Sequence, residues 1–205
     1  MSGESIVHNI LKKASCRLKF LYRYSNILNL KSRKTLCFAL IQCHFDYSSS
    51  SWYSGINKDL KQRLQIMQNK MIRYILNLNS RSHLACSEFE KLDMLNVSDR
   101  VKQNKLNHVH RIWNRTGPHY KRENFDRLCD IEIRNCTRAS ANNFFLPRVK
   151  QQGTNTFFYS GIKDWNSLPA SIKQIKEEGS FRNRVKMNIV MEARKAESCP
   201  FVFFK

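Results

Sequence analysis

The sequence predicts a mainly α-helical protein, and three observations lead to that class. Apolar residues recur every three or four positions in several segments, which is the spacing of one helix face. Gly and Pro, which most often interrupt helices, number only 6 and 4 in 205 residues. Hydrophobic residues make up 41% of the chain, enough to bury a core. We therefore expect a helical bundle followed by an α-rich unit with a small β-hairpin.

Three helices are expected in residues 1–78. The first carries an apolar stripe at spacings of four and three residues, formed by Val7, Leu11, Ala14, Leu18 and Leu21. The second is expected over residues 32–50, because no Gly or Pro interrupts this segment, and the serines that follow mark its end. The third, over residues 58–77, has the most regular stripe of the chain, formed by Leu60, Leu64, Met67, Met71 and Tyr74.

The remaining chain is assigned to an α-rich unit, residues 79–195, and a tail, residues 196–205. We expect a short helix over residues 84–95 and a longer one that Ser98 caps and Gly117 and Pro118 stop. Residues 143–150 and 154–159 are rich in aromatic and β-branched side chains, and the turn between them predicts a hairpin near 143–159. A last helix is expected over residues 181–193.

Positive charge dominates the composition. Lys and Arg number 36 against 16 Asp and Glu, which gives a formal net charge of +20. A folded chain of this charge favours an anionic partner, either nucleic acid or an acidic membrane surface. We expect RNA, DNA or an RNA–DNA hybrid as the partner and no membrane insertion, since no apolar stretch approaches the roughly 20 residues of a spanning helix.

The basic residues of the first unit are the candidate nucleic-acid-binding residues: Lys12, Lys19, Arg23, Arg33, Lys34, Arg63, Lys70 and Arg73. The first three share one side of the first helix, the next two follow in the connecting turn, and the last three lie close together on the third helix. Their contacts to phosphate would be independent of base sequence and strongly dependent on salt. The alternative is that these charges only solvate helix faces.

Three aromatic residues lie among these bases, at Phe20, Tyr22 and Tyr24. Aromatic rings can stack on nucleic-acid bases. At these spacings the rings can equally pack into the core, and the sequence leaves both roles open.

The motifs of nucleotide chemistry are missing from the sequence, so we expect no enzyme activity and no cofactor. Two-metal polymerases and nucleases need carboxylates close together, but the chain has no Asp-Asp pair, and its Gly residues form no phosphate-binding motif. His44 and Asp46 match the His-x-Asp ligand pair of non-haem iron dioxygenases. That match leaves an iron site as a remote alternative, and no metal site is predicted.

The sequence shows no secretory signal, so an intracellular location, in the nucleus or the cytoplasm, is expected. The chain has 7 cysteines, an odd number, and no Cys-x-x-Cys pair. We therefore predict that the cysteines are reduced thiols and mostly small core residues.

Several segments, taken together and in order, resemble the region that follows the palm in reverse transcriptases of non-LTR (LINE-type, jockey-like) retrotransposons. The longest are FDYSSSSWY at residues 45–53 and LQIMQNKMIRYI at residues 64–75. Shorter segments are LDML at 92–95, VSDR at 97–100, PHY at 118–120, Thr137-Arg138, Asn143, Pro147, Thr156-Phe157 and WNSLP at 165–169. The resemblance covers roughly residues 5–190, nearly the whole sequence.

The resemblance implies a thumb-like helical unit and a carboxy-terminal region that hold the template–primer duplex in an RNA-directed DNA polymerase. The family's fingers, palm, catalytic Phe/Tyr-x-Asp-Asp motif and endonuclease do not occur in this sequence, so no catalytic residue can be transferred. A palm and fingers supplied in trans are therefore a second candidate partner. Residues 1–55 also resemble a helical segment at the amino terminus of AlkB-type tRNA-modifying proteins; without a jelly roll, this implies no dioxygenase activity.

The expected function is therefore non-catalytic binding of nucleic acid by a reverse-transcriptase fragment. The principal alternative is a protein-interaction module, or a remnant without function, that has no nucleic-acid role. Basic residues scattered over every face, or neutralised by Glu88, Glu90 and Asp99, would favour that alternative.

Overall fold

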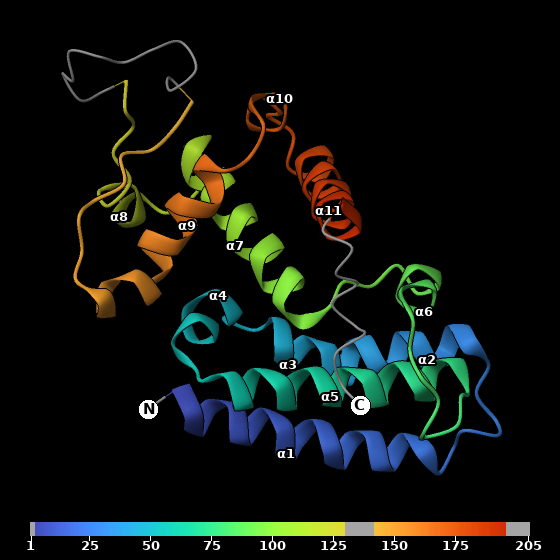
Figure 1. Cartoon of the computed structure of the whole chain (residues 1–205). Helices are drawn as coiled ribbons and strands as arrows, with labels where there is room; N and C mark the ends of the chain where they lie inside the picture. The colour runs from blue at the N-terminus through green and yellow to red at the C-terminus, as the bar shows by residue number, and fades with distance from the viewer. Residues whose placement is uncertain (1–2, 130–141, 196–205) are drawn as a thin grey trace. The chain divides into compact units, whose positions relative to one another are not determined.

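The computed structural model describes residues 3–129 and 142–195. Helices form almost all regular structure in these ranges, which confirms the mainly α class (Figure 1). The described residues divide into two compact units. One runs up to Val101 and resumes at Glu192, and the other comprises Lys102–Met191. The expected tail, residues 196–205, lies outside the described residues.

The first unit contains most of the helices that the sequence predicts. Its elements are α1 (Gly3–Tyr22), α2 (Leu30–Cys37), the π-helical turn η1 (Phe38–Gln42), α3 (Cys43–Asp46), α4 (Ser49–Trp52), the 3-10 turn η2 (Tyr53–Gly55), α5 (Lys58–Leu76), α6 (Cys86–Lys91) and the start of α7 (Val97–Trp113). The Asn57 side chain caps α5 by accepting a hydrogen bond of 2.9 Å from the backbone N–H of Leu60. Asn77, in the left-handed conformation at φ 55°, ends the helix.

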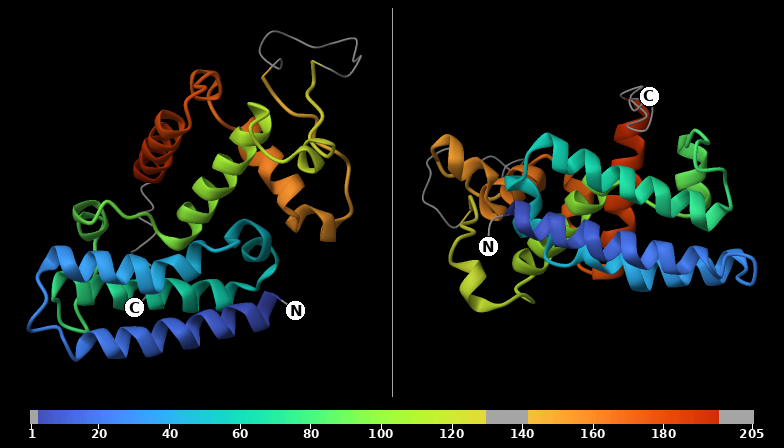
Figure 2. Two further views of the ribbon diagram at one scale, coloured as in Figure 1. Left: turned by 180° about the vertical axis from the view of Figure 1, so that it is seen from behind. Right: turned by 90° about the horizontal axis from the view of Figure 1, so that it is seen from below.

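Three helical segments form the bundle of the first unit: α1, α5 and the run α2–η1–α3 (Figures 1 and 2). Each turns an apolar stripe inward, so that Ala14, Ile41 and Leu64 are fully buried. The same core continues through Leu84 and Phe89 as far as Val101. The first compact unit therefore extends past the predicted boundary at residue 78, because the segment after α5 folds back onto the bundle core.

The helix predicted over residues 32–50 is confirmed as far as Asp46, although its residues 38–42 are π-helical, and it is then interrupted at Tyr47 and Ser48. After α3 the chain becomes extended at Tyr47, and Ser48 adopts the left-handed conformation at φ 52° before α4 begins. The Trp52 indole Nε1–H donates to the Tyr47 carbonyl at 3.0 Å, and the Trp52 side chain is buried. Burial of this large ring stabilises the break. The spacing of apolar residues does not predict such a contact, so the break could not be predicted from the sequence.

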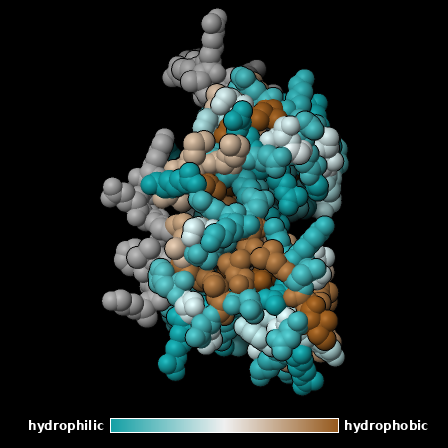
Figure 3. All heavy atoms as spheres, turned by 90° about the vertical axis from the view of Figure 1, so that its right-hand side faces the viewer, coloured by the Kyte–Doolittle hydropathy of each residue, from teal (hydrophilic) through white to brown (hydrophobic). Residues whose placement is uncertain are grey.

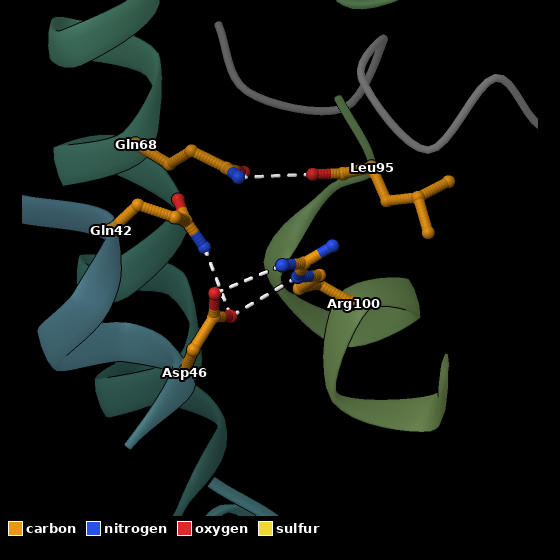
Figure 4. A network of polar contacts seen from close by, with 5 residues as sticks. All are labelled: Gln42, Asp46, Gln68, Leu95 and Arg100. Atoms are coloured by element: carbon orange, nitrogen blue, oxygen red, sulfur yellow. Dashed lines mark hydrogen bonds and ion pairs between the residues drawn. The ribbon is translucent and has the colours of Figure 1, made fainter. Parts of the chain in front are cut away.

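A partly buried polar network connects α3 to the start of α7 within the first unit (Figure 4). The Arg100 guanidinium donates from Nε to Asp46 Oδ1 at 3.1 Å and from Nη2 to Asp46 Oδ2 at 3.0 Å. Gln42 adds a hydrogen bond of 3.2 Å to Asp46 Oδ1. Nearby, the buried Gln68 amide donates to the Leu95 carbonyl at 2.9 Å. These contacts hold the segment after α6 against the bundle through polar groups as well as apolar ones.

The second unit is built around the rest of α7. It also contains α8 (His119–Arg122), the 3-10 turn η3 (Gln151–Asn155), α9 (Phe157–Asn166), α10 (Ala170–Lys173) and α11 (Glu178–Lys195), which continues past Met191. The Trp165 ring is fully buried and lies near the rings of Trp113, Phe144 and Phe181, with centroid distances of 5.5–5.9 Å. The core of this unit is therefore largely aromatic.

The predicted hairpin near 143–159 is wrong. Residues 151–155 form η3 and residues 157–166 form α9, and the only β-type pairing among the described residues is an isolated bridge between Arg127 and Phe144. The Thr156 hydroxyl accepts from the Tyr159 backbone N–H at 3.4 Å and so begins a helix. Ile162 and Trp165 are buried on one face of this helix, whereas Phe158 at its start stays 37% exposed. The packing of these two buried side chains overrides the strand propensity of the aromatic residues.

Two helix boundaries also differ from prediction. Helix α7 begins at Val97, and its cap is Asn96 instead of Ser98, because Asn96 Oδ1 accepts from the Asp99 backbone N–H at 2.7 Å. The last helix starts at Glu178, three residues before the predicted Phe181. Asn96 and Glu178, which mark the two observed starts, are polar. The apolar stripes of these helices therefore do not determine where they begin.

The cysteines differ from the expectation of reduced core residues. Cys16 and Cys43 are exposed free thiols, Cys129 is exposed as well, and Cys37 is a buried free thiol. Cys86 is disulfide-bonded, which contradicts the prediction at that position. Cys136 and Cys199 lie outside the described residues.

None of the helices in residues 3–129 and 142–195 combines the length and the apolar character that crossing a membrane requires.

Candidate nucleic-acid interface

Helices α1 and α5 lie side by side and run in the same direction (Figure 2). Near their starts, Arg63 Nη1 of α5 lies 3.3 Å from His8 Nε2 of α1. Near their ends, the Tyr74 hydroxyl of α5 donates to the Leu21 carbonyl of α1 at 3.0 Å. The sequence offsets of these pairs are 55 and 53 residues. A residue of α5 is therefore level with the α1 residue about 54 positions earlier.

A hollow of about 390 Å³ opens along this α1–α5 seam. Its lining comes from both helices: His8, Leu11, Lys12, Ser15, Arg63, Ile66, Met67 and Lys70. Leu11, Ile66 and Met67 supply its apolar surface, and the other residues supply hydroxyl, imidazole and cationic groups. Three predicted site residues, Lys12, Arg63 and Lys70, are thus brought to one place although they are up to 58 positions apart in the sequence.

The row of cations continues along the seam beyond the hollow. Lys19 follows Lys12 by two helical turns, about 10 Å along α1, and Arg23 lies in the turn directly after the last residue of α1, Tyr22. By the offset of 54 residues, Lys70 is level with residue 16, between Lys12 and Lys19. The side chains of Lys12, Lys19, Arg23, Arg63 and Lys70, here called the seam cations, are all exposed. Positive charge from two helices therefore alternates along one line.

Acidic side chains are absent from the sequence around most of the seam cations. The sequence has no Asp or Glu between Glu4 and Asp46, or between Asp59 and Glu88. Within the part of the chain that the structure describes, no seam cation takes part in an ion pair. The three acids considered as neutralising partners contact other residues: Glu88 lies 3.9 Å from Lys91, Glu90 lies 2.5 Å from Arg194, and Asp99 accepts from Asn96 at 2.9 Å. The seam therefore presents uncompensated positive charge.

Three predicted site residues serve internal contacts instead. Arg33 donates from Nη2 to the Ser25 carbonyl at 2.7 Å, and its guanidinium carbon lies 5.8 Å from the centre of the Tyr74 ring. Arg73 donates from Nε to the Ser82 carbonyl at 2.9 Å and holds the loop after α5. Lys34 lies 5.9 Å from the Phe38 ring. All three side chains are half-buried, so they are less available to a ligand than the seam cations.

His8 is a lining residue that the sequence reasoning missed. Its Nδ1 lies 2.8 Å from the Glu4 carbonyl, and its Nε2 faces the Arg63 guanidinium. The position of His8 one turn before Lys12 placed it on the same side of α1. The contact of His8 with Arg63, 55 residues away, could not be predicted from residue spacing within α1.

The three aromatic residues near the end of α1 are exposed. Phe20, Tyr22 and Tyr24 keep 51%, 46% and 45% of their surface accessible. Figure 3 faces the end of the first unit where α1 ends and α2 begins, and shows hydrophobic side chains exposed among hydrophilic ones. Of the two roles left open by the sequence, full burial in the core is therefore excluded for these rings.

The geometry does not support the iron-ligand hypothesis for His44 and Asp46. The Arg17 guanidinium contacts His44 Nε2, and burial, with the nearby charges of Arg17 and Lys13, lowers the pKa of His44. Asp46 is held by Arg100, as described above. Among the described residues, no group of three His, Cys, Asp or Glu side chains is placed to hold a metal ion.

Comparison of the chain with protein-family models, with curated proteins and with solved structures finds no match.

Proposed function

We propose that this chain is a non-catalytic nucleic-acid-binding module that contacts the sugar–phosphate backbone along the α1–α5 seam. The observation that carries the proposal is a row of five exposed cations along α1, the turn after it and α5, none of which forms an ion pair with an acid among the described residues. A polyanion with regularly spaced charges satisfies such a row better than a single anion does. The ligand is RNA, DNA or an RNA–DNA hybrid, because contacts to phosphate carry no sequence information.

The resemblance to the region after the palm of non-LTR reverse transcriptases supports the same role. In that family this region holds the template–primer duplex, and the seam lies in the part of the chain where the resemblance places the thumb. The role proposed here is binding alone, because the sequence has no Asp-Asp pair with which to bind two catalytic metal ions. A second proposed partner is the palm and fingers of a reverse transcriptase supplied as a separate chain. The proposed location of this interaction is inside the cell.

The test is binding of the whole chain to a fluorescent RNA–DNA hybrid, a DNA duplex and a single-stranded RNA between 50 and 300 mM KCl. Five phosphate contacts on duplex DNA predict a slope of about −4.5 for log K against log salt. The triple variant Lys12→Ala, Lys19→Ala, Lys70→Ala should reduce the magnitude of that slope by about 3, and weaken binding to all sequences alike.

The matched control is the triple variant Lys58→Ala, Lys91→Ala, Lys163→Ala. It removes the same charge from three exposed lysines that are not seam cations. The control should keep the slope of the parent chain within about one unit. If the two variants lose equal affinity for nucleic acid, the net charge of the chain governs binding and the position of the cations on the seam does not. Absence of salt-dependent binding by the parent chain would overturn the proposal and favour a protein-interaction module.

A further inference from the structure

The exposed rings at the end of α1 flank the last two seam cations. Lys19, Phe20, Tyr22, Arg23 and Tyr24 fall within six consecutive residues. At 100° per residue, Phe20 lies to one side of the Lys19 row on α1 and Tyr22 lies to the other. The rings are also arranged as pairs: Phe20 and Tyr24 have centroids 5.2 Å apart, and Tyr22 meets Tyr74 edge-on at 4.9 Å. The Phe20–Tyr24 pair and the Tyr22–Tyr74 pair therefore lie on either side of the last seam cations.

Packing does not account for this arrangement. Each ring keeps about half of its surface accessible, although α1 buries its apolar stripe completely at Val7 and Ala14. The chain just after Tyr24 adds exposed apolar side chains at Ile27 and Leu30. Exposed aromatic residues next to a cationic row are the combination with which proteins bind single-stranded nucleic acid, because every base offers a face for stacking.

Three candidate occupants are distinguished by charge and by base accessibility. A second protein seated on this end of α1 would have to balance cations that form no ion pair with any acid among the described residues. A fully paired duplex would satisfy the cations, but it would leave the rings without a partner, since its bases are stacked on one another. A single strand satisfies both groups at once.

We infer that the end of α1 is a stacking platform for unpaired bases, so that the seam binds a single strand or the single-stranded part of a partly paired nucleic acid. This inference rests on the proposed function of the seam. Phe20 and Tyr24 receive the bases while Lys12, Lys19 and Arg23 contact the phosphates. The length of α1 from Lys12 to its end at Tyr22, about 15 Å, corresponds to about four stacked nucleotides at 3.4 Å each.

The experiment compares binding of the whole chain to a ten-nucleotide oligodeoxythymidylate and to a blunt ten-base-pair duplex. The double variant Phe20→Leu, Tyr24→Leu removes both rings and keeps apolar bulk at the surface. Its affinity for the single strand should fall by about 5-fold to 150-fold, the range for loss of one stacked base. Its affinity for the duplex should change by less than about 2-fold. Replacement of one thymine by 2-aminopurine should give an emission change on binding that the double variant loses.

The matched control is Tyr47→Leu, Tyr120→Leu, which removes two exposed aromatic rings at positions outside the platform. This control should bind the single strand as the parent chain does. Far-UV circular dichroism and the thermal midpoint of each variant establish that the fold is kept.

Three results would overturn the inference while leaving the proposed function in place or untouched by the rings, and a fourth would overturn both. If the double variant binds the single strand normally while the Lys12, Lys19, Lys70 variant does not, the seam function stands and the platform does not. If the double variant loses duplex and single-strand binding equally, the rings do not select unpaired bases. If the rings instead mediate a concentration-dependent dimer seen by sedimentation, with unchanged nucleic-acid affinity, the platform is a self-association surface. Failure of the parent chain to bind any nucleic acid would overturn the proposed function as well.

Discussion

At the scale of single residues, Asp46 holds the start of α7 within the first unit through Arg100. It accepts from both Nε and Nη2 of Arg100, and their side chains keep only 27% and 23% of their surface exposed. An arginine at this depth needs a partner, because the loss of one member of a partly buried pair leaves the other charge desolvated and unpaired.

We predict that Asp46→Asn lowers the free energy of unfolding by about 2 kcal/mol. Asparagine keeps the volume and one carbonyl acceptor but removes the negative charge opposite Arg100. Urea unfolding followed by circular dichroism measures the loss. The double variant Asp46→Asn, Arg100→Met should be less destabilised than the sum of its single variants, since it leaves no unpaired charge. Additive losses would show that the pair contributes no coupling.

His110 gives the second unit a dependence on pH. Its ring is buried and stacks on Phe181 at a centroid distance of 3.9 Å, with Nε2 2.7 Å from the Ile175 carbonyl. Burial is the main cause that lowers the pKa of His110. The Ile175 carbonyl and Glu178 oppose this effect, and Arg111 adds to it. The unfolded chain therefore binds the proton more readily than the folded one.

The stability due to neutral His110 should be complete above the ordinary histidine pKa of about 6.5 and should be lost as the pH falls toward the lower pKa of the folded state. We predict that the urea midpoint of the parent chain falls between pH 7.5 and pH 5.5. His110→Gln, which keeps a donor for the Ile175 carbonyl, should be less stable at pH 7.5 but show a smaller fall. An unchanged fall in this variant would assign the pH dependence to other groups, such as His108, whose pKa burial also lowers.

At the scale of helices and turns, Ser48 marks the break between α3 and α4. Its left-handed conformation, φ 52°, is unfavourable for a residue with a Cβ atom by about 1 kcal/mol. We predict that Ser48→Gly raises the free energy of unfolding by up to about 1 kcal/mol, and that the β-branched Ser48→Val lowers it by at least as much. Thermal unfolding of the two variants measures both effects. A stabilising Ser48→Val would mean that the break is absent in solution.

The same break shows what the sequence could predict about the elements. The stripe from Leu60 to Tyr74 gave α5 nearly to the residue, because burial of one helix face is a periodic property. The turn at Ser48 and the helix α9 were not predicted, because each depends on where a ring packs: Trp52 in the first case and Trp165 in the second. These ring contacts form only in the folded tertiary structure, so the spacing of residues along the sequence does not predict them.

The candidate site was predictable to a similar degree. The side of α1 that carries Lys12 and Lys19 follows from helical spacing alone, whereas Arg23 lies in the turn after the helix. Its alignment with Arg63 and Lys70 depends on the parallel packing of α1 and α5, which the spacing within each helix leaves undetermined. Arg33 and Arg73 were indistinguishable from the others by sequence, because the carbonyls that they contact belong to loops whose course the pattern does not specify.

At the scale of the whole molecule, the net charge of +20 sets how stability responds to salt. Excess charge of one sign destabilises a compact state through self-repulsion, and salt screens charges that are more than about 10 Å apart at 0.1 M. The seam concentrates five of the cations on two adjacent helices without acids between them. The first unit should therefore be the part that gains most from screening.

We predict that the apparent thermal midpoint of the parent chain rises between 20 and 200 mM NaCl, by about 2–4 °C for each kcal/mol of repulsion that is screened. The Lys12→Ala, Lys19→Ala, Lys70→Ala variant should start from a higher midpoint at 20 mM and gain less from salt. The Lys58→Ala, Lys91→Ala, Lys163→Ala control should gain more than the seam variant, because its lysines are dispersed and Lys91 lies near Glu88. A midpoint that falls with salt would mean that attractive ion pairs, such as Lys105 with Asp164 at 3.0 Å, outweigh the repulsion along the seam.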